Sequence, residues 1–183
     1  ITESWVGTDM QLPKPRTAGI PEIFQQTLAS DQNGLDPLVL AIGGDQTQHL
    51  LYRLKHGQLL PAYANDSTAV FCVLIGTNNL GAGELPGPTV KGILAVAEYL
   101  MKTTKGHLLL LKLLPRGDGF LKLCPPRCSL SGKPSASFMP AVREVNDAIT
   151  EGLGPLKQKY GSNRIELLDC GSRFLLNGSN EVE

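Results

Sequence analysis

Several features that would indicate a specific class of function are missing from this sequence. Its 17 lysine and arginine residues balance 17 aspartate and glutamate residues, and no cluster of five or more basic residues occurs. This balance gives no reason to expect nucleic acid or an anionic membrane as a partner. The longest strongly apolar stretch, around Leu108–Leu114, is far shorter than a membrane span. We therefore expect no nucleic-acid partner and no membrane span.

Cofactor and metal signatures are equally scarce. The turn Gly43–Gln48 lacks the G-x-G-x-x-G spacing of a dinucleotide site, and the chain has no Walker sequence. Cys124 and Cys128 flank Pro-Pro-Arg, where a local disulfide and a metal half-site both stay open, although no second pair stands at zinc spacing. Cys72 and Cys170 are expected to be plain buried thiols. We predict neither a cofactor nor a metal.

The sequence does contain an alternation of apolar runs and helical patterns. Four runs have the nearly continuous apolar character of parallel strands buried on both faces: Leu38–Ile42, Ala69–Ile75, Leu108–Leu114 and Arg164–Asp169. Helices are expected at Glu22–Ala29, Thr47–Lys55, Val90–Met101 and Ala141–Tyr160, the last interrupted near Gly152–Pro155. The 183 residues, 42% of them hydrophobic, are thus predicted to form one α/β domain, residues 1–183, with a three-layer parallel sheet.

Two of the predicted strands end in small polar turns. Gly43-Gly44-Asp45 follows Leu38–Ile42, and Gly76-Thr77-Asn78-Asn79 follows the run that ends at Ile75. Ligands of open α/β sheets bind at the carboxyl ends of the strands. We therefore expect the two turns to face one pocket, with the Gly- and Pro-rich segment Gly81–Pro88 at its rim.

Both turns offer hydrogen-bond donors that suit an oxyanion. Gly44 can present an unhindered backbone N–H, although such a glycine also serves simply to make a tight turn. The side-chain amide of Asn78 donates without needing a proton from solution. The alternative for Asn78 and Asn79 is that they cap the turn through their own backbone.

A complete catalytic group cannot be identified from these patterns. Asp45 is expected to cap the helix that follows it. His49, His56 and His107 do not stand near a serine or cysteine in a recognisable nucleophile elbow, and each is expected to be structural or exposed to solvent. The residues by themselves therefore indicate half of a site.

Four segments together resemble the SGNH (GDSL-type) hydrolase family: Ala41–Leu54 (AIGGDQTQHLLYRL), Val73–Asn79 (VLIGTNN), Leu113–Gly117 (LLPRG) and Arg143–Ile149 (REVNDAI). With the strand spacing, the resemblance extends over nearly the whole chain, and it is strongest to the acetylhydrolases of that family. It implies a three-layer, flavodoxin-like parallel sheet. It also implies a serine mechanism on an acyl or acetyl ester, with Gly44 and Asn78 completing the oxyanion hole by motif.

The blocks that the family uses for its nucleophile and base are missing here. Ile1–Trp5 resembles the residues that come directly after the Gly-Asp-Ser block in the family, and Asp169 has Ser172, not histidine, three residues later. The resemblance therefore implies a domain truncated at both ends, without its first strand, and inactive as given. Ser4 is not assigned as the nucleophile.

Two functions are possible as hypotheses. The first is an ester hydrolase represented by a fragment, with a small acyl ester as its substrate. The alternative is a non-catalytic, SGNH-like structural or interaction subunit of a larger assembly. In either case a protein partner, or a segment outside these 183 residues, is expected to supply the first strand.

Overall fold

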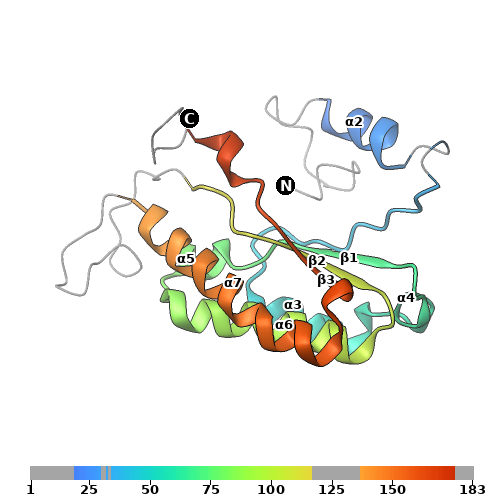
Figure 1. The fold of residues 1–183 in the computed structure, drawn as a ribbon. Coiled ribbons are helices and arrows are strands. Elements are labelled where there is room, and N and C mark those ends of the chain that lie inside the picture. Colours follow the sequence, from blue (N-terminus) through green and yellow to red (C-terminus); the bar gives the residue numbers. More distant parts are fainter. Residues whose placement is uncertain (1–18, 30–31, 33, 117–136, 176–183) are drawn as a thin grey trace. The chain divides into compact units, whose positions relative to one another are not determined.

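The computed structural model describes residues 19–29, 32, 34–116 and 137–175 (Figure 1). The predicted loop Arg116–Pro140 falls largely outside the described residues, as do Cys124, Cys128 and the segment 1–18. The chain separates into two compact units, Ile1–Asp45 and Gln46–Glu183. The prediction of a single domain stays a prediction.

The first unit contains one regular helix among its described residues. Helix α2 (Ile20–Thr27) follows Gly19, whose left-handed conformation (φ 83°) turns the chain into the helix, and Pro21 occupies its first turn. The predicted strand Leu38–Ile42 is wrong, because these residues form no strand and Leu38, Leu40 and Ile42 are exposed. An apolar run becomes a strand only where a neighbouring strand completes its ladder of hydrogen bonds.

The second unit contains the sheet and most of the helices. In chain order its elements are α3 (Thr47–Arg53), η3 (Leu54–Gln58), α4 (Pro61–Asn65), β1 (Val70–Val73), α5 (Thr77–Ala82), α6 (Pro86–Thr103), β2 (His107–Leu111), α7 (Met139–Tyr160), η4 (Ser162–Arg164), β3 (Ile165–Leu168) and η5 (Gly171–Phe174). Its alternation of helices and strands confirms the α/β class that the sequence predicts.

The three strands are parallel and lie in the order β1-β2-β3. Phe71 pairs with Leu108, and Leu108 with Ile165, so these three side chains share one face of the sheet. Three of the four predicted strands are therefore confirmed, each somewhat shorter than its apolar run. The flavodoxin-like order with a further strand stays a prediction.

The helices α3, α6 and α7 lie along one face of the sheet (Figure 1). Parallel strands joined by right-handed crossovers place every connecting helix on the same face when the chain moves across the sheet in one direction. The order β1-β2-β3 is such a movement. The core lies between this face and the helices, and its most buried side chains are Leu80, Ile93, Val96, Leu108, Leu110, Val145 and Ile149.

Helix α7 runs without a break through Pro155, so the predicted interruption near Gly152–Pro155 is wrong. A proline inside a helix removes one backbone hydrogen bond and normally favours a break. Here Leu153 and Leu156 are buried on either side of it, and their packing holds the backbone helical. Tertiary packing therefore overrides the local signal.

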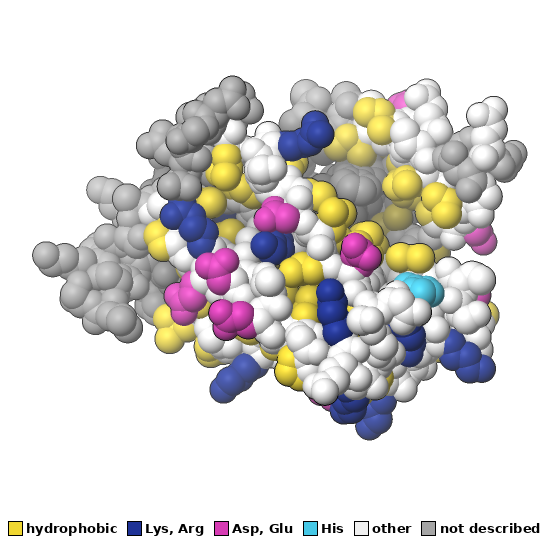
Figure 2. All heavy atoms as spheres, in the orientation of Figure 1, with side chains coloured by type: hydrophobic (Ala, Val, Ile, Leu, Met, Phe, Trp, Pro, Cys, Tyr) yellow, Lys and Arg dark blue, Asp and Glu magenta, His cyan; other side chains and the backbone are white. Residues whose placement is uncertain are grey.

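Within the described part of the second unit, no helix packs on the opposite face of the sheet. Val70, Leu74 and Leu168 are exposed on it, and so is Cys72, so the prediction of a buried thiol at Cys72 is wrong. The predicted third layer stays a prediction. On the side of α7, Figure 2 shows basic and acidic side chains interspersed, with no field of one sign.

Candidate functional site

Asn78 stands just beyond the carboxyl end of β1. Gly76 turns the chain with a left-handed backbone (φ 119°), and a Cβ at this position would lie 2.8 Å from the Cδ1 atom of Ile93. Only glycine satisfies both demands at once. Helix α5 then begins at Thr77, which places Asn78 in its first turn with a half-buried side chain. The predicted position at a strand's carboxyl end is confirmed.

The adjacent Asn79 has a different environment, because its side chain has no exposed surface. Its Oδ1 accepts the backbone N–H of Thr47 at 3.0 Å, and its Nδ2 donates to the Oγ1 of Thr47 at 3.1 Å. The same Nδ2 donates to Gln48 and Glu84. For Asn79, the alternative that it caps its own turn is wrong, since its partners lie on α3 and beyond α5. Its amide has no donor left for a ligand.

Arg116 contacts the turn from the other side. Its Nη1 donates to the carbonyl oxygen of Thr77 at 2.7 Å, and its guanidinium lies 4.3 Å from the ring centroid of Phe138. A Cβ on Gly81 would lie 2.6 Å from Nη1. A planar cation can stack on an aromatic ring while its edge donates a hydrogen bond. Arg116 therefore fixes the peptide that precedes Asn78.

Gly44 lies in a turn of the first unit. Its backbone is left-handed (φ 86°), and the N–H of Asp45 donates to the carbonyl oxygen of Ile42 at 3.3 Å. This geometry confirms a tight turn that requires glycine. The convergence of the Gly44 N–H with the Asn78 amide on one crevice stays a prediction.

Helix α3 begins at Thr47, as the sequence predicts, but the expected cap is wrong. Its N-cap is Gln46 and not Asp45, and the Nδ1 of His49 accepts the N–H of Gln46 at 3.2 Å. His56 stacks on Tyr52, and His107 lies 3.2 Å from the carbonyl oxygen of Asn163. All three histidines are exposed, which agrees with the expectation that each is structural or exposed to solvent.

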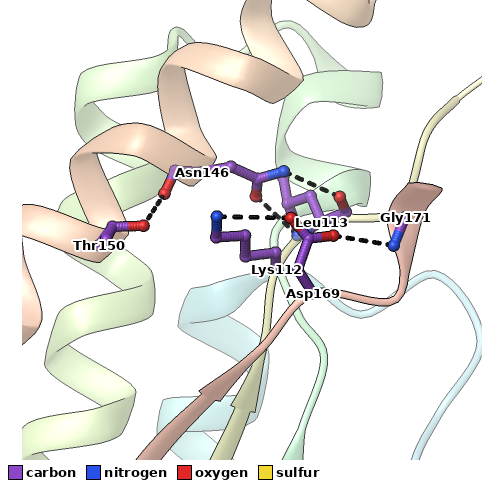
Figure 3. A network of polar contacts seen from close by, with 6 residues as sticks. All are labelled: Lys112, Leu113, Asn146, Thr150, Asp169 and Gly171. Carbon is purple, nitrogen blue, oxygen red and sulfur yellow. Dashed lines mark hydrogen bonds and ion pairs between the residues drawn. The ribbon is translucent and has the colours of Figure 1, made fainter. Parts of the chain in front are cut away.

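A polar network holds the carboxyl ends of β2 and β3 (Figure 3). The side-chain amide of Asn146 on α7 accepts the N–H of Leu113 at 2.7 Å and donates to its carbonyl oxygen at 3.0 Å. Lys112 and Asp169 form an ion pair at 3.4 Å, and Asp169 also accepts the N–H of Gly171 at 2.9 Å. The Asn146 side chain thus makes both hydrogen bonds to the backbone of Leu113, as a neighbouring strand would, and joins the end of β2 to α7.

Sequence reasoning assigned no supporting role to Asn79, Arg116 or Asn146. For Asn146 a signal exists, because it is a polar residue on a helix face that otherwise carries Val142, Val145 and Ile149. Such a residue finds a hydrogen-bond partner in the core. For Asn79 and Arg116, the partners are too distant in sequence to be inferred.

The described residues offer no metal site, since no group of three or more histidine, cysteine, aspartate or glutamate side chains comes together among them. A shallow hollow of about 330 Å³ lies by Val70, His107, Asn163 and Glu166. These residues begin or precede strands, so the hollow lies at the amino ends of the strands, away from Asn78. No helix in the described part of the chain has the length and apolar content to cross a membrane.

No protein-family model matches the chain. Among individual proteins, human platelet-activating factor acetylhydrolase IB subunit alpha2 is 38% identical over 87 residues, which are 46% of this chain and 34% of the relative. The bovine alpha1 subunit is 33% identical over 118 residues, 58% of this chain and 47% of the relative. The chicken alpha2 subunit is 40% identical over 80 residues, 42% of this chain and 31% of the relative.

The chain is homologous to these acetylhydrolase subunits over part of its length. The matched stretches span between about a third and a half of the relatives' length. This partial homology makes the chain acetylhydrolase-like, in agreement with the class of hydrolase that its motifs resemble.

Proposed function

We propose that this chain is part of an SGNH-type carboxylic ester hydrolase that acts on a short acyl ester, such as an acetyl ester, by a serine mechanism. The observation that carries the proposal is the position of Asn78. It lies in the first turn of α5, shortly after the end of the parallel strand β1, with the Thr77 carbonyl held by Arg116 and the adjacent Asn79 held by Thr47. Homology to acetylhydrolase subunits supports the same reaction.

In this proposal the chain supplies the oxyanion hole. The N–H of Gly44 and the side-chain amide of Asn78 donate to the oxygen of the tetrahedral intermediate, and each donor contributes roughly 3–4 kcal/mol to the transition state. The attacking serine and the histidine that accepts its proton come from outside these 183 residues. The chain by itself is then inactive.

The sheet fits the same proposal. In the order 2-1-3-4-5, β1, β2 and β3 are the third, fourth and fifth strands. Within the described residues β1 is an edge strand that pairs only with β2. A first strand from a protein partner, or from a segment outside these residues, would pair with the free edge of β1.

The test is ester hydrolysis by the full-length product of the gene that encodes this sequence. With p-nitrophenyl acetate as the substrate, we expect Asn78→Ala to lower kcat by roughly 10²- to 10³-fold with little change in KM, because the lost donor acts on the transition state. Asn65→Ala is the matched control, since Asn65 is exposed on α4. An Asn78→Ala variant with unchanged kcat would remove the site assignment.

The isolated 183-residue chain gives a second test. It is expected to hydrolyse p-nitrophenyl acetate no faster than its Gly44→Ala/Asn78→Ala double variant, because oxyanion donors without a positioned nucleophile leave little catalysis. Robust turnover that Ser4→Ala abolishes would contradict both the assignment of the missing nucleophile and the proposal.

A further inference from the structure

A polar cluster with a buried centre lies next to the proposed oxyanion donor. Its four members are Thr47 and Gln48 in the first turn of α3, Asn79 in α5, and Glu84 just after α5. Asn79 is its centre, because it alone contacts the other three through its side chain. The cluster joins segments that lie more than thirty residues apart in the sequence.

The hydrogen bonds of this cluster leave Asn79 no freedom. Its Oδ1 accepts the first backbone N–H of α3, which no carbonyl within the helix can satisfy. Its two Nδ2 hydrogens are shared among three acceptors, of which the carboxyl oxygen of Glu84 is one. Its own carbonyl oxygen accepts the backbone N–H of Glu84 at 3.0 Å. Asn79 is therefore fixed by both its side chain and its backbone.

Helix α5 needs such support. It has only six residues, and a helix of this length does not hold its own conformation. Arg116 binds the carbonyl oxygen of Thr77, and Asn79 binds α3 and Glu84, so the residues before and after Asn78 are both anchored from outside the helix. An oxyanion donor is effective only when it is oriented before the reaction begins.

We propose that Asn79 is a positioning residue that orients Asn78 through its hydrogen bonds to Thr47 and Glu84. This inference rests on the proposed function of Asn78. Asn79 itself touches no substrate, because it is fully buried and its donors are engaged.

The hydrogen bond from Asn79 to Glu84 allows the inference to be tested, because two substitutions can swap which of the two residues is the donor and which is the acceptor. Asn79→Asp places two carboxyl groups in contact, so the donor is lost and like charges repel. Adding Glu84→Gln reverses the pair, because an amide now donates from position 84 to a carboxylate at position 79. The net charge of this double variant equals that of the wild type.

The experiment measures kcat, KM and the melting temperature of the full-length protein on p-nitrophenyl acetate. We expect Asn79→Asp to lower kcat by about 10- to 100-fold with KM within twofold, and the double variant to recover kcat to within about threefold of wild type. The deficit of Asn79→Asp relative to wild type shrinks as the pH falls from 8 to 5.5, since a proton shared by the two carboxyls restores a donor. Asn65→Asp is the control for the substitution itself and leaves kcat unchanged.

The outcomes separate this inference from the proposed function. An active wild type with unchanged kcat in Asn79→Asp overturns the inference alone. The inference is also overturned if the loss of kcat in Asn79→Asp is fully explained by a smaller fraction of folded protein. It is overturned as well if the double variant regains the wild-type melting temperature but not the wild-type kcat. A wild-type protein without esterase activity overturns the proposed function and the inference with it.

Discussion

The two faces of the sheet have similar sequences but different environments. On one face Leu108 and Ile165 are almost completely buried under α6 and α7. On the other face Leu109 is half-buried and Glu166 is exposed, although these two residues pair with each other just as Leu108 and Ile165 do. Even where an apolar run does form a strand, it therefore does not show that both faces of that strand are covered.

The path of the chain explains the difference. Each strand of the described sheet follows its neighbour in sequence, so both crossovers, α6 and α7, lie on one face. A helix on the opposite face requires a connection that crosses the sheet in the other direction. The contrast between the two faces leads to four predictions, from the largest expected effect to the smallest.

The largest contrast is expected between Leu110 and Leu168. Leu110 is 1% exposed, so Leu110→Ala should lower the free energy of unfolding by about 2–5 kcal/mol through lost burial and a cavity. Leu168 is 42% exposed on the other face, so Leu168→Ala should cost less than about 1 kcal/mol. Urea denaturation of the chain measures both values, and equal losses would contradict the difference between the faces.

On the covered side of the sheet, the contact between α3 and α6 is expected to leave no room for a larger side chain. A Cβ on Gly92 of α6 would lie 2.2 Å from the Oγ1 of Thr47. Because Thr47 is buried and β-branched, it cannot turn aside freely, and Gly92→Ala should destabilise the fold by about 1–3 kcal/mol. Lys91→Ala, at the exposed neighbouring position, should stay within about 0.5 kcal/mol of wild type. A neutral Gly92→Ala would show that α3 and α6 pack loosely.

Cys72 tests how open the other face is. Desolvation between the strands, together with the Cys170 thiol, raises the pKa of the Cys72 thiol. At pH 7.5 its thiolate fraction is therefore below that of an ordinary thiol, whose pKa is about 8.5. In a variant with Cys72 as its only cysteine, iodoacetamide should label the native protein completely. The labelling should be slower than that of a free thiol and should become faster as the pH rises towards 10.

A need for denaturant before Cys72 reacts would contradict its exposure. A rate that does not change with pH between 7 and 10 would contradict the raised pKa.

The smallest effect is expected for polar substitutions on the uncovered face. Val70 is 62% exposed, so the double variant Val70→Thr/Leu168→Thr should change the free energy of unfolding by less than about 1 kcal/mol. The measurement is again urea denaturation. A loss above about 2 kcal/mol would mean that this face is covered in solution.

Much of the fold could be predicted from sequence. The runs at Ala69–Ile75, Leu108–Leu114 and Arg164–Asp169 each contain a strand, because alternation of apolar strands with amphipathic helices is a local pattern. Leu38–Ile42 has the same pattern and forms no strand. A strand depends on a partner that the run itself does not specify.

The candidate site also has a part that sequence could predict and a part that it could not. Motif and position were enough to single out Gly44 and Asn78, because a glycine with positive φ and an amide after a strand are both local features. The role of Asn79 was not available from sequence, since no local feature shows where its side chain finds its partners. Only the long-range contact with Thr47 shows that Asn79 is committed to the fold.

The sequence by itself determined the α/β class, the turn glycines and the acetylhydrolase-like motifs, because these depend on residues close together in the chain. Tertiary structure alone decided which face of the sheet is buried, that α7 continues through Pro155, and that Arg116 and Asn79 hold the turn around Asn78. These features depend on side chains that meet across thirty or more residues. Packing and hydrogen-bond geometry, which no local pattern encodes, select those partners.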